Sequence, residues 1–175
     1  NARATGVLKR VLLPGIGRRN VDAVVNVLIG STVKLGPTTL AIPNCTLAAE
    51  GLLYPETALE LRAEVNNLPR LLSQPAGATM PRQVTANGTL RVHPTLDLSL
   101  RVSTRAFSVG DLRVGPLWAS GTVTPHHLRI YSLQGKIAQG RLRGKITLPL
   151  KDIRRPTGEL QLQDAVLPGR VGKLN

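Results

Sequence analysis

Alternation of apolar and polar residues with a period of two is the feature that most constrains how this chain can fold. From Gln83 onward the alternation is nearly continuous, and in residues 96–103 every even position is apolar and every odd position polar. Successive side chains of a β-strand point to opposite faces, so the pattern predicts strands with one apolar and one polar face. The same pattern predicts further strands at residues 58–65, 88–92, 112–114, 128–130, 142–148 and 158–163, and shorter ones at 33–35 and 39–42. The chain is therefore expected to be all-β with little helix.

Turn signals separate these predicted strands at fairly regular intervals. They include Asn87-Gly88, Gly115-Pro116 and Gln139-Gly140. Such short connections favour antiparallel neighbours, because parallel strands need a long crossover. Residues 20–28 are compatible with a helix or a strand, and their valines favour a strand. Two regions, 1–20 and 66–80, are expected to be loops, the second with room for one helical turn.

The apolar residues are almost all aliphatic. Hydrophobic residues make up 42% of the chain but aromatic residues only 2%. Compact cores normally use several aromatic rings, each of which buries about 150–250 Å². The composition therefore favours a thin, repetitive structure with an aliphatic lining. A sandwich, a closed barrel and an open, curled sheet that holds a lipid chain would each cover the apolar faces.

The positive charge lies at the two ends of the chain. The formal net charge is +13, of which residues 1–34 contribute +5, residues 35–128 +1 and residues 129–175 +7. Such a field attracts polyanions, including nucleic acid and anionic lipid head groups. Proteins that stack nucleic-acid bases usually place aromatic residues among the cations, and residues 141–155 contain none. Nucleic acid is therefore not expected as a partner.

The sequence contains no pattern that predicts catalysis or metal binding. The single cysteine, Cys45, excludes an internal disulfide and any zinc site with several cysteines. His126 and His127 follow a Thr-Pro turn and have no acidic residue within ten positions, so a metal site is not expected. The carboxylates show no paired catalytic arrangement, and no cofactor motif is complete. No apolar run reaches the roughly 18 residues that a membrane-spanning helix needs. We expect no enzyme, no catalytic residue and no cofactor.

A family resemblance is found in the repeated strand openings. Residues 128–148 contain a strand, a shorter strand, the motif Gly-Arg-Leu-Arg-Gly and another alternating strand. Residues 46–53 and 85–90 have similar small-residue openings around a glycine. This texture resembles the AsmA and TamB-like proteins of Gram-negative cell envelopes, over roughly residues 30–165.

The resemblance implies a fold and a function. The fold would be an elongated, curved antiparallel sheet that forms an open groove, a β-taco, and residues 1–175 would be one repetitive segment of a longer protein. The implied function is non-catalytic: binding phospholipid or another acyl lipid, bridge-like lipid transport, or outer-membrane assembly together with assembly proteins. The implied location is the periplasm and cell envelope, with an anchor in the inner membrane outside these residues.

The groove hypothesis assigns roles to particular residues. Arg141, Arg143 and Lys145 would contact lipid head groups at the wet rim. Alternatives are a β-sandwich or β-solenoid adhesion or scaffold module, in which the apolar residues fill a dry core, and a basic nucleic-acid-binding β domain. The residues expected to contact acyl chains are Leu90, Val92, Leu96, Leu98, Leu100, Val102, Leu128, Ile130, Leu142, Ile146, Leu148, Leu160 and Leu162.

Overall fold

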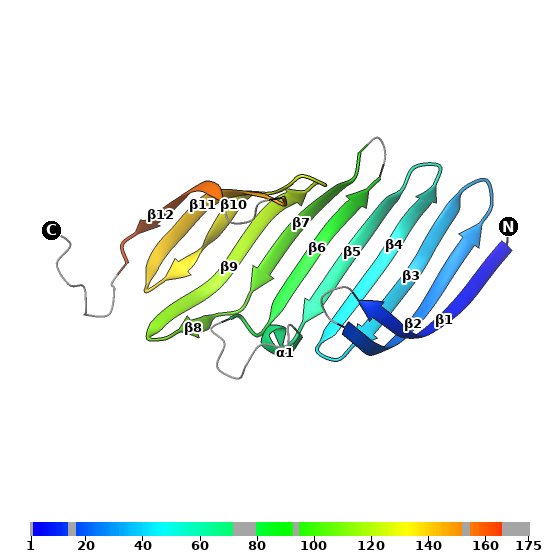
Figure 1. The fold of residues 1–175 in the computed structure, drawn as a ribbon, viewed down its shortest axis with the longest axis horizontal. Helices are drawn as coiled ribbons and strands as arrows, with labels where there is room; N and C mark the ends of the chain where they lie inside the picture. Colours follow the sequence, from blue (N-terminus) through cyan, green and yellow to red (C-terminus); the bar gives the residue numbers. More distant parts are fainter. Residues whose placement is uncertain (1, 14–16, 72–79, 93–94, 152–154, 166–175) are drawn as a thin grey trace.

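The chain forms one long antiparallel sheet (Figure 1). The computed structural model describes residues 2–13, 17–71, 80–92, 95–151 and 155–165. The prediction of an all-β fold with little helix is confirmed. The elements are β1 (Ala2–Leu13), β2 (Gly17–Ile29), β3 (Val33–Ile42), β4 (Cys45–Tyr54), β5 (Ala58–Val65), α1 (Leu68–Leu71), β6 (Val84–Arg91), β7 (Asp97–Thr104), β8 (Phe107–Val109), β9 (Leu112–Val123), β10 (His127–Ile137), β11 (Gly140–Pro149) and β12 (Thr157–Gln163).

The strands follow one another in space in the order of the sequence. The sheet runs β1-β2-β3-β4-β5-β6-β7-β9-β10-β11-β12, and the short β8 pairs with β9 beside this path. Every pairing is antiparallel, as short turns predict. Two of the predicted turns are wrong, because Asn87-Gly88 lies within β6 and Gly115-Pro116 within β9. Because β1 and β12 lie at opposite ends and do not pair, the sheet is open (Figure 1).

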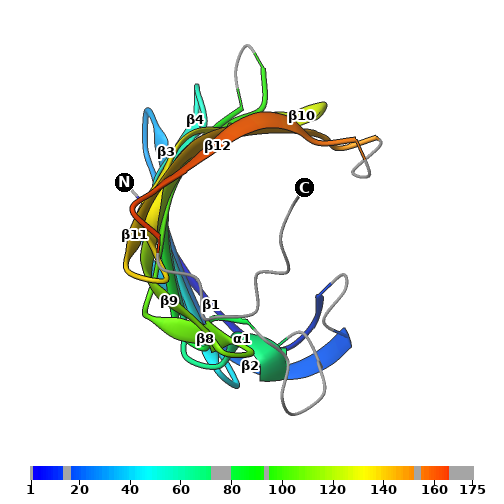
Figure 2. The ribbon, with the colours of Figure 1, turned by 90° about the vertical axis from the view of Figure 1, so that its left-hand side faces the viewer.

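Each strand is curved, so the sheet forms a long open trough, which we call the gutter. Viewed along the long axis, the strands trace a C whose opening runs the length of the molecule (Figure 2). The register shifts at several places, including between Leu35 and Thr38 of β3 and between Ile130 and Leu133 of β10. Such bulges bend a strand and increase its local twist. The gutter confirms the expected curved, open antiparallel sheet.

The register brings the apolar positions of all strands to the same face. Residues directly opposite in an antiparallel ladder share a face. One row across the sheet pairs Leu90 with Leu98, Leu98 with Val123, and continues to Leu128 and Leu148. The parallel row one step along alternates large and small residues from Leu61 to Ile130 and then continues to Ile146. Its members are Leu61, Gly88, Leu100, Gly121, Ile130 and Ile146.

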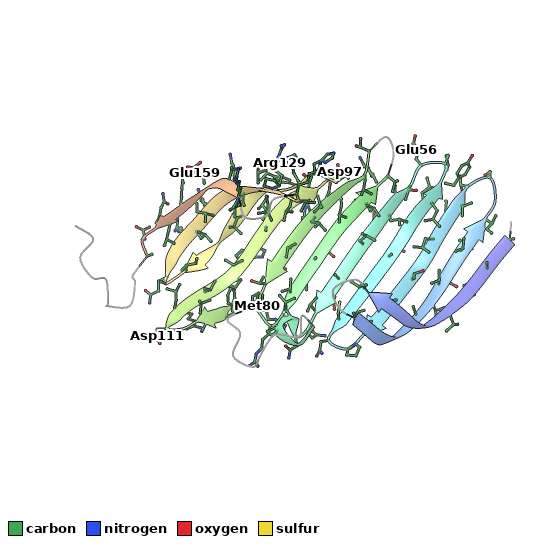
Figure 3. All side chains as sticks on the ribbon, in the orientation of Figure 1. Glu56, Met80, Asp97, Asp111, Arg129 and Glu159 are labelled. Carbon is green, nitrogen blue, oxygen red and sulfur yellow. The ribbon has the colours of Figure 1, made fainter. Side chains whose placement is uncertain are left out.

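The apolar face is the concave face. Leu68 of α1, which lies on the inner side of the arch (Figure 2), packs against the buried cluster of Ala23, Ile42 and Cys45. These three residues belong to the apolar face. On the opposite face, Arg129 and Glu159 project outward from the arch (Figure 3). The molecule is therefore apolar inside the gutter and polar outside it.

The expected loop at residues 1–20 is wrong over most of its length. Residues 2–13 form β1, and β2 begins at Gly17. The Pro14-Gly15 signal indicated a loop, and residues 2–6 lack clean alternation, but their backbones still pair with β2 because ladder hydrogen bonds do not depend on the side chains. The strand preference for residues 20–28 is confirmed. In the region 66–80, α1 supplies the one helical turn, and residues 72–79 lie outside the described residues.

Candidate apolar groove

The concave face brings together the residues predicted to contact acyl chains. Those within strands lie on this one face, although they come from five different strands. The row through Leu90, Leu98, Leu128 and Leu148 shows this directly. The others are Leu100 and Val102 on β7, Ile130 on β10, Leu142 and Ile146 on β11, and Leu160 and Leu162 on β12.

Four of the predicted contacts lie at the margins of this face. Val92 follows β6 and Leu96 precedes β7, so both lie at one lip of the gutter, where each is 45% exposed. Leu160 and Leu162 lie on the last strand and are 60% and 45% exposed. They have a neighbouring strand on one side only, which explains their greater exposure.

An apolar hollow on this face lies farther toward the N-terminus than predicted. It has a volume of about 370 Å³ between β3 and β7, and of the predicted contacts only Leu100 lines it. The alternation predicted the strands in this region. Its alanines, such as Ala63 and Ala86, are too weakly hydrophobic to be predicted as acyl-chain contacts from the sequence. The register places Ala63 and Ala86 side by side in one row, between Leu47 and Val102. The apolar side chains that line the hollow are those of Leu40, Leu47, Ala49, Leu61, Ala63, Ala86 and Leu100.

The concave face is accessible. Among the residues that the structure describes, the buried hydrophobic ones are Ala23, Ile42, Cys45, Val114 and Ala138. The accessible surface is 12765 Å², against about 8,300 Å² for a compact monomer of this mass. All described strands belong to one sheet, so no second described sheet covers the face. The sandwich alternative is therefore wrong as an architecture for this part of the chain.

The residues predicted to contact head groups do not line the groove. Arg141, Arg143 and Lys145 alternate with Leu142, Gly144 and Ile146 along β11, so they lie on the convex face. A lipid in the groove would not contact them. The sequence showed that they occupy the polar face, but only the curvature shows that the polar face is the outer one.

The lips of the gutter carry other polar residues. Glu56 and Asp97 lie at one lip, and Asp111 lies at the other (Figure 3). Near α1, the backbone N–H of Arg105 donates a hydrogen bond to the carbonyl of Gln83, the residue that follows Arg82. Arg82 and Arg105 are both exposed. Cations are thus present where the apolar surface meets water.

The described residues offer no candidate metal site. They contain no group of three or more His, Cys, Asp or Glu side chains that could hold a metal ion. Burial raises the pKa of the Cys45 thiol, which disfavours the reactive thiolate. Within the same ranges no helix is long and apolar enough to cross a membrane.

Comparison of the chain with family models, curated proteins and solved structures gave no match.

Proposed function

We propose that this chain is a non-catalytic lipid-binding segment whose concave face holds acyl chains. The observation that supports it is the register, which joins apolar positions of successive strands into one accessible surface along the gutter. The resemblance to AsmA and TamB-like proteins supports the same assignment. On this proposal the segment belongs to an envelope protein that passes lipid along its groove or assists outer-membrane assembly.

The dimensions of the gutter suit acyl chains. Eleven strands lie side by side along its axis, and at about 4.8 Å per strand they extend over about 50 Å. The hydrocarbon core of a bilayer is about 30 Å thick and holds two acyl chains end to end. The gutter is therefore long enough for about three such chains in line.

An aliphatic groove needs no specific polar contact to hold lipid. Each methylene that leaves water contributes about 0.8 kcal/mol. Leucine, valine and alanine side chains offer similar contacts at every position along the axis, so moving a chain along the groove exchanges one set of contacts for an equivalent set. The head group would stay in water at a lip, where Arg82 and Arg105 are candidates to meet its phosphate.

The first test is native mass spectrometry of the purified chain, followed by extraction and identification of bound lipid. We expect phospholipid or another acyl lipid at a stable stoichiometry. A lipid-free mass together with a cooperative thermal transition would contradict the proposal and favour a scaffold role.

A pair of matched variants tests which face binds. In Leu98→Asp/Leu100→Asp, two carboxylates enter the concave face of β7, and we expect bound lipid to fall at least tenfold because burying a charge beside an acyl chain is costly. In Ser99→Asp/Ser103→Asp, the same two charges enter the convex face of the same strand, and we expect lipid content near that of the native chain. Circular dichroism checks that both variants keep their strand content. Equal lipid content in the two variants would rule out the concave face as the site.

A further inference from the structure

The convex face of β9, β10 and β11 combines five cations with two exposed aromatic rings. Trp118 is 55% exposed and Tyr131 is 50% exposed, and both lie on this polar face. We name this surface the basic–aromatic patch. Its residues are Trp118, Tyr131, Arg129, Lys136, Arg141, Arg143 and Lys145.

The register brings the rings to the cations. Trp118 is opposite Gln134, which in turn is opposite Arg143. The bulge in β10 between Ile130 and Leu133 places Tyr131 beside Lys145. Tyr131, Arg143 and Lys145 share the lining of a shallow hollow of about 260 Å³. The tryptophan is more than twenty residues from Arg143 and Lys145 in the sequence. Residues 141–155 contain no aromatic residue, but the folded surface around these cations therefore does.

The five cations of the patch outnumber the acid beside them, Glu159, which lies directly opposite Lys145 on β12. Within the described part of the chain the ion pair found is Arg62–Glu64, on β5. Lys136 and Arg141 lie directly opposite each other, an arrangement of like charges that destabilises a sheet. The acid on this part of the face, Glu159, accepts a hydrogen bond from Gln161 at 2.6 Å. This surplus of positive charge would be offset by an external anion.

We propose that the basic–aromatic patch docks on the surface of an anionic phospholipid bilayer. Arginine and lysine residues are attracted to anionic head groups, and tryptophan and tyrosine rings favour the membrane–water interface. The cations are spread over two strands on several sides of the rings, which suits an extended charged surface better than a single line of phosphates. A plane that touches an arch meets it along the long axis, and the row from Trp118 to Arg143 runs in that direction.

This docking is independent of the proposed groove function. The patch and the groove lie on opposite faces of the sheet, so a docked molecule keeps its concave face away from the bilayer surface. A molecule could therefore bind a membrane through one face with or without lipid in the other. The two proposals can fail separately.

The test is binding to vesicles of phosphatidylcholine with and without phosphatidylglycerol. Trp118 is the single tryptophan of the chain, so its fluorescence reports directly on the patch. We expect a blue shift and co-sedimentation with the phosphatidylglycerol vesicles only, both weakened by salt. Binding to pure phosphatidylcholine vesicles of equal strength would overturn the proposal.

Matched variants separate the patch from net charge. Arg141→Gln/Arg143→Gln/Lys145→Gln removes three cations from the patch, and we expect vesicle affinity to fall roughly tenfold or more. Arg3→Gln/Lys34→Gln/Arg91→Gln removes three exposed cations from β1, β3 and β6, and we expect a loss of less than threefold, an order-of-magnitude estimate from the same principle. Equal losses would show that overall charge alone drives binding.

Two further comparisons complete the test. Trp118→Ala should also weaken vesicle binding, whereas Leu98→Asp/Leu100→Asp should leave it intact while reducing bound lipid.

A single-stranded oligonucleotide could also bind the patch, because nucleic acid binds proteins through aromatic stacking and cations. Tighter binding of the oligonucleotide than of phosphatidylglycerol vesicles, with the same dependence on Trp118, would overturn the proposal and assign the patch to nucleic acid.

Discussion

At the scale of single residues, Cys45 lies where α1 covers part of the concave face. Its side chain is buried beneath α1 with Ala23 and Ile42, and this burial raises the pKa of the thiol above its usual value of 9.0. Below about that pH the thiol is protonated in both the folded and the unfolded chain. As the pH rises above it, the unfolded chain ionises first, so the free energy of unfolding should fall.

The measurement is urea denaturation of the native chain and of Cys45→Ala at pH 8 and pH 10. Cys45→Ala removes the ionising group, and we expect its free energy of unfolding to fall less between the two pH values than that of the native chain. Equal decreases in the two proteins would show that Cys45 is not protected. Alkylation by iodoacetamide supplies an independent check, because a buried thiol should react far more slowly in the folded chain than in urea.

At the scale of elements, leucines that lie over glycines determine how neighbouring strands pack on the concave face. A Cβ on Gly144 of β11 would lie 2.5 Å from Cδ2 of Leu160 and 2.7 Å from the carbonyl oxygen of Glu159. Gly144→Ala should therefore lower the free energy of unfolding by about 1–3 kcal/mol, since added atoms force β12 to shift. The measurement is urea denaturation followed by circular dichroism.

Gly6 provides the control for this prediction. It lies within a strand, like Gly144, but a Cβ there would have no atom within 4 Å. Gly6→Ala should change the free energy of unfolding little, and its lower unfolded-state entropy favours a small increase. A cost at Gly6 as large as that at Gly144 would show that strand propensity, not packing between β11 and β12, causes the loss.

At the scale of the whole molecule, a single-layer sheet leaves much apolar surface in water. A ligand that binds only the folded chain adds to its stability, by about 2.7 kcal/mol at a free concentration of 100 times Kd. We therefore expect the Tm of the delipidated chain to rise as short-chain phosphatidylcholine is added below its micelle concentration. The Tm of Leu98→Asp/Leu100→Asp should stay constant under the same conditions. A parallel rise in both proteins would mean that the lipid acts outside the concave face.

Much of the fold followed from local patterns, and the errors have local causes as well. Strict alternation in residues 96–103 predicted β7 because a strand's side-chain period is short and visible in one segment. The prediction failed at β1, where small and polar residues interrupt the alternation but the backbone still pairs. It also overlooked Ala63 and Ala86, because an alanine contributes to a groove floor only when leucines of neighbouring strands stand around it.

The sequence by itself determined which side chains share a face of each strand, because that alternation is a property of the local backbone. It also determined the antiparallel order, because short turns permit no crossover. Only the tertiary structure decided which face is concave, since arching depends on bulges, small floor residues and pairing across the whole sheet. The same long-range register removed Arg141, Arg143 and Lys145 from the groove and brought Trp118 into one row with Arg143, with Gln134 between them. Residues far apart in the sequence become neighbours only when strands pair, and no local pattern encodes that proximity.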